Sequence, residues 1–256
     1  MSESSLPGST KALLFDVFGT VVDWRNSIER EMKKFADTQS GEANFDGGNL
    51  ASGKLADQDW QQFALDWRAL YQPAMEKIRE GDRGYVKLDL LHRENLQLLL
   101  SDYGLEDCDD ASLEYINTVW HRLRPWADTL PGMYRLKRKF ILGSLSNGNI
   151  ALMVNMARYS GIPWDAILGS EPTRGYKPQA HVYLDSVEML GLKPDQCLMV
   201  AAHNDDLHAA RSLGLQTAYV NRPDEYGSAQ TVDKQAEDDW DMVCESMTEL
   251  ADELGC

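Results

Sequence analysis

The amino-acid sequence predicts an α/β protein, with a doubly wound parallel-sheet core and a helical domain inserted into it. Two observations carry this prediction. Short apolar runs alternate with helical patterns in the second half of the chain, and a long, strand-poor stretch of helical character follows the first apolar run. Strands that alternate with helices favour a parallel sheet with right-handed crossover connections. A stretch this long cannot be a loop inside a compact domain, so we expect an insertion.

The candidate strands are short apolar runs that end at turn-forming or polar residues. Five runs meet this description: 12–15, 140–145, 166–168, 197–201 and 217–220. Helical patterns separate the last four of them, and a glycine follows each helix, as expected just beyond a helix end. These helices are expected at 150–159, 179–190 and 205–213.

The stretch after the first run predicts the inserted domain. Its helix candidates are 27–38, 57–79, 86–103 and 111–123. Between the first two, residues 39–53 are rich in Gly, Asn, Ser and Asp, which favours irregular structure. We therefore expect residues 1–24 and 126–256 to form the α/β core and residues 25–125 to form a helical cap inserted after the first strand.

Composition limits the partners that the protein could bind. The 256 residues include 41 acidic and 25 basic side chains, and the formal net charge is −16. A strongly negative field disfavours nucleic acid or an anionic membrane surface as a partner. An anionic small-molecule substrate would therefore need a local positive patch.

The same chain has the features of a reduced, cytoplasmic protein. Its polar N-terminal residues lack the basic start and apolar centre of a signal peptide. No apolar run approaches the ~18 residues of a membrane span. The cysteines have no paired spacing, which indicates neither a disulfide framework nor a zinc site. They are Cys108, Cys197, Cys244 and Cys256.

Polar residues with catalytic chemistry follow four of the predicted strands. Taken alone, each is more simply a turn or surface residue. The carboxyl ends of parallel strands converge on one crevice, however, so these side chains should meet there. A carboxylate, a hydroxyl, a cation and a second carboxylate form a set suited to covalent catalysis. The residues are Asp16, Ser146, Asn147, Lys177, His203 and Asp206.

On these residues the chain resembles the haloacid dehalogenase superfamily, and within it the type II 2-haloacid dehalogenases. The matching motifs begin with Asp-x-x-Gly-Thr at residues 16–20 and Ser-Asn at 146–147. Lys-Pro at 177–178 with Tyr183 and the acidic loop ending at Asp206 complete them. The resemblance covers nearly the whole chain. It implies a Rossmann-like core and a helical cap.

The resemblance also implies a reaction. Small 2-haloalkanoic acids, such as chloroacetate and 2-chloropropionate, would be hydrolysed to 2-hydroxy acids and halide through an ester on Asp16. Phe18 together with His203 resembles a subgroup that includes defluorinating members, so fluoroacetate is among the implied substrates. The residues leave open the preferred halide and whether L or D acids are taken.

Motif positions imply roles for further residues. Ser146 and the backbone at Val17 and Phe18 would bind the substrate carboxylate. Asn147 and Arg68 would cradle the halide, and Trp67 would line the pocket, because residues 66–68 resemble the cap segment whose arginine reaches over the active site. Thr20 and Tyr183 would orient other groups. Lys177 and Asp206 would keep Asp16 ionised, and one of them, or His203, would activate water.

Two positions argue against the magnesium-dependent phosphatases of the superfamily. Phe18 stands where they need a second aspartate as acid and base, and Ala202 stands where they need a metal-binding aspartate. We therefore expect no metal and no cofactor. A magnesium-dependent phosphatase and a non-catalytic binding protein remain the alternatives. Dimers are frequent among relatives, so a homodimer is allowed, but the sequence indicates no interface.

Overall fold

The computed structural model describes residues 9–46, 55, 57–81 and 83–256. The chain forms two compact units. The core unit comprises Met1–Asp23 and Arg124–Cys256, and the inserted unit comprises Trp24–Leu123. The chain leaves the core unit after strand β2 and returns to it at strand β3, and these two strands pair antiparallel. Their bounds are Val22–Asp23 for β2 and Arg124–Pro125 for β3.

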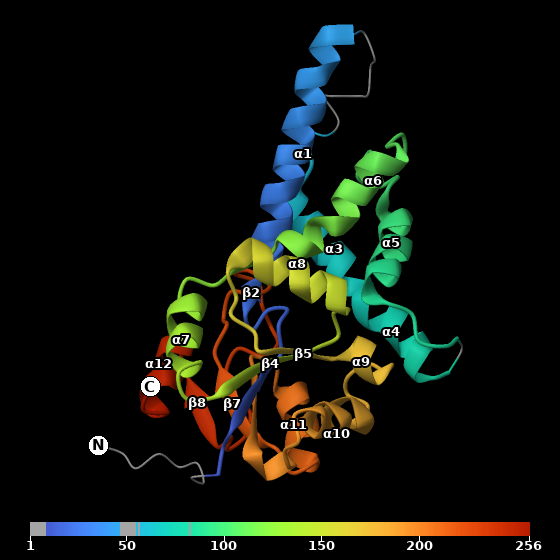
Figure 1. Ribbon diagram of the computed structural model, residues 1–256. Helices are drawn as coiled ribbons and strands as arrows, with labels where there is room; N and C mark the ends of the chain where they lie inside the picture. The colour runs from blue at the N-terminus through green and yellow to red at the C-terminus, as the bar shows by residue number, and fades with distance from the viewer. Residues whose placement is uncertain (1–8, 47–54, 56, 82) are drawn as a thin grey trace. The chain divides into compact units, whose positions relative to one another are not determined.

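The core unit contains a six-stranded sheet in the order β5-β4-β1-β6-β7-β8 (Figure 1). All neighbouring strands pair parallel, which confirms the predicted fold class. The chain runs outward from β1 to one edge and then returns to build the other side, so the strand order reverses at β1. Such a reversal is where α/β proteins place their ligand sites. The strands are Ala12–Phe15 (β1), Ile141–Ser146 (β4), Ala166–Gly169 (β5), Cys197–Ala201 (β6), Gln216–Val220 (β7) and Met242–Cys244 (β8).

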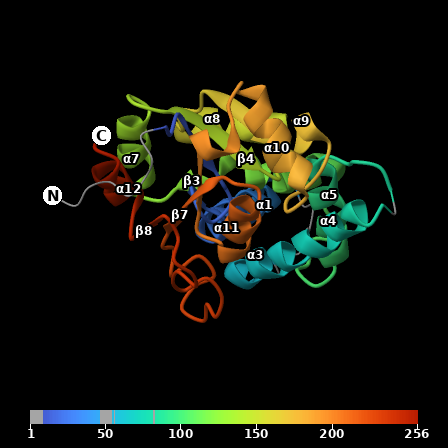
Figure 2. The same cartoon turned by 90° about the horizontal axis from the view of Figure 1, so that it is seen from below.

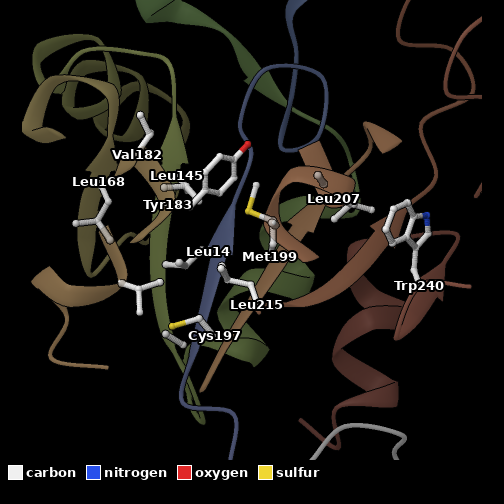
Figure 3. Close-up of a cluster of buried hydrophobic side chains, with 14 of the residues drawn as sticks. Leu14, Leu145, Leu168, Val182, Tyr183, Cys197, Met199, Leu207, Leu215 and Trp240 are labelled. Carbon is white, nitrogen blue, oxygen red and sulfur yellow. The ribbon is translucent and has the colours of Figure 1, made fainter. Parts of the chain in front are cut away.

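Two helices, α10 (Ala180–Met189) and α11 (Asn204–Ser212), pack on one face of this sheet. Successive side chains of a strand point to opposite faces. Leu14 of β1 and Met199 of β6 therefore share a buried apolar cluster with Tyr183 of α10 (Figure 3). The two helices meet where the Tyr183 hydroxyl of α10 donates to Asp206 in the first turn of α11, just beyond the carboxyl end of β6.

Further helices complete the core unit. Helices α7 and α12 lie side by side in both views (Figures 1 and 2). They approach closely at Gly132, where a Cβ atom would lie 2.3 Å from the carbonyl oxygen of Met247. The bounds are Thr129–Leu136 (α7), Ile150–Ser160 (α8), Ser170–Thr173 (α9) and Met247–Glu253 (α12), with a 3₁₀ turn at Pro194–Gln196.

The inserted unit is helical, but its helices differ from those predicted. The predicted helix over 57–79 is wrong, because α3 ends at Ala69 and α4 starts at Tyr71. Pro73 explains the break, since it has no N–H to bond the Ala69 carbonyl and its ring crowds that group. Segment 39–53 is helical as far as Asp46, and its residues 47–53 lie outside the described chain. The helices are Trp24–Asp46 (α1), Trp60–Ala69 (α3), Tyr71–Arg79 (α4), Leu88–Leu99 (α5) and Asp110–Asn117 (α6), with a 3₁₀ helix at Thr118–Arg122.

No helix within the described ranges is long and apolar enough to cross a lipid bilayer.

Candidate active site

Asp16 follows β1 directly and is held in place by the loop that it opens. Its backbone N–H donates to the carbonyl of Val200 in β6 at 3.0 Å. The Thr20 hydroxyl donates to Asp16 Oδ2 at 2.7 Å, and the backbone N–H of Ala202 donates to the same hydroxyl at 2.9 Å. Thr20 thus links the first strand to the loop after β6 and fixes the orientation of the Asp16 carboxylate.

Lys177 joins the two buried carboxylates of the site. Its ammonium nitrogen lies 2.8 Å from Asp16 Oδ1 and also donates to Asp206 Oδ2. The other oxygen of Asp206 accepts a 2.5 Å hydrogen bond from the Tyr183 hydroxyl. Asp206 stands in the first turn of α11, where the helix dipole favours a negative charge. Residues from three strand ends therefore meet around one ammonium group.

This arrangement keeps Asp16 ionised. Burial by itself would raise the pKa of Asp16, but the charge of Lys177 and the hydrogen bond from His203 outweigh it and hold that pKa far below its usual value. Burial and the neighbouring Asp16 raise the pKa of Asp206. Burial would lower the pKa of Lys177, but the two carboxylates raise it. Asp16 is therefore the carboxylate with the more persistent negative charge.

Ser146 and Asn147 lie at the end of β4, beside the same loops. The backbone N–H of Gly148 donates to Ser146 Oγ at 3.1 Å, so the serine hydroxyl can still donate its own hydrogen. The backbone N–H of Lys177 donates to Asn147 Oδ1 at 2.9 Å. Because Oδ1 accepts this bond, Asn147 presents its amide NH₂ as a donor elsewhere.

His203 lies between two carboxylates. Its Nδ1 is 3.1 Å from Asp16 Oδ2, and its Nε2 is 2.9 Å from Oε2 of Glu225. Burial would lower the pKa of His203, but Glu225 and Asp16 raise it well above the ordinary value. Glu225 is 1% exposed. It was not predicted as a site residue, although the argument about converging strand ends applies equally to the loop after β7, which carries it.

A network behind the Asp16 loop anchors this β7 loop. The Arg222 guanidinium donates to the carbonyl of Thr20 at 3.0 Å and binds both oxygens of Asp128 at 2.9 and 3.0 Å. The indole N–H of Trp126 donates to the carbonyl of Gly19 at 2.7 Å. Arg222 and Trp126 therefore hold the main chain of the Asp16 loop through two consecutive carbonyl groups, those of Gly19 and Thr20.

Arg68 and Trp67 belong to the inserted unit. The guanidinium of Arg68 stacks over the Tyr71 ring, with 4.1 Å to the ring centroid, and lies 5.8 Å from the Trp24 ring. Trp67 is fully buried, and its indole N–H donates to the carbonyl of His92 at 3.1 Å. Within this unit both side chains take part in aromatic packing.

The two positions that weigh against magnesium carry buried apolar side chains. Phe18 is 3% exposed and Ala202 is 1% exposed. A divalent ion that prefers oxygen ligands would find no carboxylate at either position, so the residues present do not fit such a group. What the site does provide is a desolvated, ionised carboxylate with a fixed orientation, which is suited to nucleophilic attack.

Comparisons with known proteins identify the relatives of this chain. Residues 10–214 match the family model of the haloacid dehalogenase-like hydrolases. An (S)-2-haloacid dehalogenase from Pseudomonas putida is 24% identical to this chain, and the match covers 83% of this chain and 85% of the relative. An (S)-2-haloacid dehalogenase from Xanthobacter autotrophicus is 27% identical, and the match covers 83% of this chain and 75% of the relative. The solved structure of a defluorinating L-2-haloacid dehalogenase is 40% identical, with a TM-score of 0.88 over 98% of this chain and 99% of its own. The solved structure of another L-2-haloacid dehalogenase is 42% identical, with a TM-score of 0.85 over 96% of this chain and 99% of its own.

Proposed function

The chain belongs to the haloacid dehalogenase-like hydrolases, and on this premise we propose that it hydrolyses small 2-haloalkanoic acids to 2-hydroxy acids and halide. The observation that carries the proposal is Asp16, a buried carboxylate held ionised by Lys177 and His203, with Phe18 where an acid and base would stand. The relatives are named L-2-haloacid dehalogenases, which supports L substrates for this chain, and one of them is named as defluorinating. We therefore include fluoroacetate beside chloroacetate and 2-chloropropionate among the proposed substrates.

The first step forms a covalent ester. An Asp16 carboxylate oxygen attacks the halogen-bearing carbon from the side opposite the halogen, and the carbon–halogen electron pair leaves with the halide. A fixed carboxylate beside a bound substrate makes this displacement effectively intramolecular. A halide ion is a weak base, so its departure needs no proton donor and no metal. This is why apolar side chains at Phe18 and Ala202 suit the reaction.

Substrate binding is assigned to residues at the strand ends and in the inserted unit. The Ser146 hydroxyl and the backbone of Val17 and Phe18 bind the substrate carboxylate. The Asn147 amide offers a donor to the departing halide, where negative charge develops.

Motif position, not geometry, assigns roles to two residues of the inserted unit. Arg68 is assigned to the departing halide and Trp67 to the substrate. The second step, attack of water on the Asp16 ester, regenerates the enzyme and releases the 2-hydroxy acid. Lys177 donates a hydrogen bond to the ester carbonyl during that step, and Asp206, itself bound by the Tyr183 hydroxyl, holds the Lys177 ammonium group in place.

Halide release tests the proposal directly. The purified protein is incubated in EDTA with chloroacetate, fluoroacetate and each enantiomer of 2-chloropropionate. Release should persist in EDTA and fall at least about 1,000-fold in Asp16→Asn, because that substitution removes the nucleophile. Asp205→Asn, the same change at an exposed neighbour of Asp206, is the matched control and should keep wild-type activity.

Two outcomes would contradict the proposal. If no halide appears but phosphate is freed from phosphoesters once Mg²⁺ is added, the protein is a phosphatase. If both assays are silent, the proposal is wrong and the fold stands without an assigned reaction.

A further inference from the structure

We propose that Glu225 is a positioning residue that fixes His203 as the base of the second step, and that the net proton of the reaction leaves when the ester forms. This inference rests on the proposed function. Glu225 comes from the loop after β7, which no motif of the chain marks as part of the site.

The Glu225 carboxylate is buried in the active site and contacts both His203 and the Asp16 loop. Glu225 is 1% exposed, and its Oε2 is 2.9 Å from His203 Nε2. The carboxylate also fills the space beside Gly19, where a Cβ atom would lie 2.1 Å from Oε1. Gly19 has a φ of 91° and, having no side chain, lets the carboxylate approach the Asp16 loop.

Both ring nitrogens of His203 face acceptors. Asp16 reaches Nδ1 from the end of β1, and Glu225 reaches Nε2 from the β7 loop. The remaining charged groups of the site, Lys177 and Asp206, pair with each other on the far side of Asp16. Ionised carboxylates only accept hydrogen bonds, so the resting His203 carries a proton on each nitrogen and is an imidazolium.

Ester formation removes the negative charge of Asp16, the acceptor at Nδ1. Once Asp16 is esterified, the negative charge that held the Nδ1 proton has left with the halide. His203 then releases that proton to solvent, which it can reach because its side chain is 18% exposed. The other proton stays on Nε2, which donates it to Glu225, and this fixes the neutral tautomer whose Nδ1 lone pair points towards the ester.

The neutral imidazole then drives hydrolysis. Nδ1 takes a proton from water as the oxygen of that water bonds to the Asp16 carbonyl carbon. When the tetrahedral intermediate collapses, the bond from that carbon to the substrate oxygen breaks, and this oxygen takes the proton back from Nδ1. The Asp16 carboxylic acid finally passes its proton to Nδ1. One water is consumed and one proton is released per turnover, which balances the reaction.

The test separates the two steps in a single turnover with enzyme in excess over chloroacetate. Glu225→Gln should release halide within about threefold of the wild-type rate. It should form glycolate about 10- to 100-fold more slowly, because a mispositioned base loses part of the rate acceleration that general-base catalysis contributes. The ester should then accumulate and appear as added mass on the Asp16 peptide. Glu225→Asp should recover part of the rate, and Asp224→Asn, an exposed acid beside it, should match wild type.

The pH profile distinguishes positioning from a purely structural role. Without the Glu225 charge the His203 pKa falls, so the base stays neutral to lower pH. The acid limb of glycolate formation should therefore lie at lower pH in Glu225→Gln than in Glu225→Asp. Equal slowing of halide and glycolate, unchanged glycolate formation or an unmoved acid limb would each overturn the inference. Absence of halide from wild type and Asp224→Asn alike would instead overturn the proposed function.

Discussion

Each unit of the chain holds a histidine that is largely shielded from solvent, and the two side chains have opposite surroundings. His203 of the core unit lies between the carboxylates of Asp16 and Glu225. His92 of the inserted unit is 1% exposed, and neither of its ring nitrogens has a hydrogen-bond partner within the described chain. Its ring stacks on Trp120, with 4.2 Å between centroids.

The surroundings decide which protonation state each histidine keeps. Carboxylates on both sides favour the imidazolium of His203. Burial among aromatic rings disfavours the charged form of His92 and lowers its pKa to about 3, against 6.5 for an ordinary histidine. His203 is therefore the charged histidine of the active site, whereas His92 is a neutral ring packed in an aromatic cluster.

The same substitution at both positions should give very different results. His203→Phe removes the positive charge between Asp16 and Glu225 and leaves Lys177 as the cation beside Asp16, and removing one partner of a buried charge cluster costs about 3–5 kcal/mol. The loss of the base should also slow ester hydrolysis by about 100-fold or more. His92→Phe keeps the stacking and removes two buried polar atoms, so the free energy of unfolding should stay within about 1 kcal/mol.

Urea unfolding and the rate of glycolate formation from chloroacetate, measured on both variants, check this contrast. A comparable loss of stability at the two positions would show that the charges around His203 are not what distinguishes it.

Lowering the pH should change the contributions of His92 and His203 to the free energy of unfolding in opposite directions. Because the pKa of His92 is lower in the folded state than in the unfolded chain, its contribution is present above the unfolded pKa and is lost as pH falls. At about pH 4.5 the loss relative to neutral pH should be about 2–3 kcal/mol. His203 has the opposite sign, since its raised pKa gives stability that is full below the unfolded pKa and is lost as pH rises.

Urea unfolding near neutral pH and at about pH 4.5 tests the acid side. His92→Phe should lose less stability on acidification than wild type, by about that amount. Parallel losses in the two proteins would mean that folding does not lower the pKa of His92.

Much of the site was predictable because it follows from strand order. Asp16, Ser146 and Asp206 lie at or just beyond the ends of strands, and parallel strands bring such residues together. Lys177 joins them from the loop that follows β5 and α9. Motif spacing added Thr20 and implied Tyr183 at positions that the structure places on the same carboxylates.

What the sequence did not reveal depends on contacts between distant segments. Glu225 acquires its place because Arg222 ties the β7 loop to Thr20 and Asp128, and no local pattern reports such a bond. Strand β8 was missed because Met242–Cys244 is too short to form a recognisable run. The break between α3 and α4 was visible in Pro73, but the apolar periodicity on both sides outweighed it in the prediction.

One measurement tests the covalent role of Asp16 most directly. A single turnover with enzyme in excess over chloroacetate in ¹⁸O-water should place the label in the peptide that carries Asp16 and leave the first glycolate unlabelled. That result follows because water attacks the aspartyl carbonyl and not the substrate carbon. Label in the glycolate with none in the peptide would mean that water displaces the halide directly, and the account of Asp16 as nucleophile would be wrong.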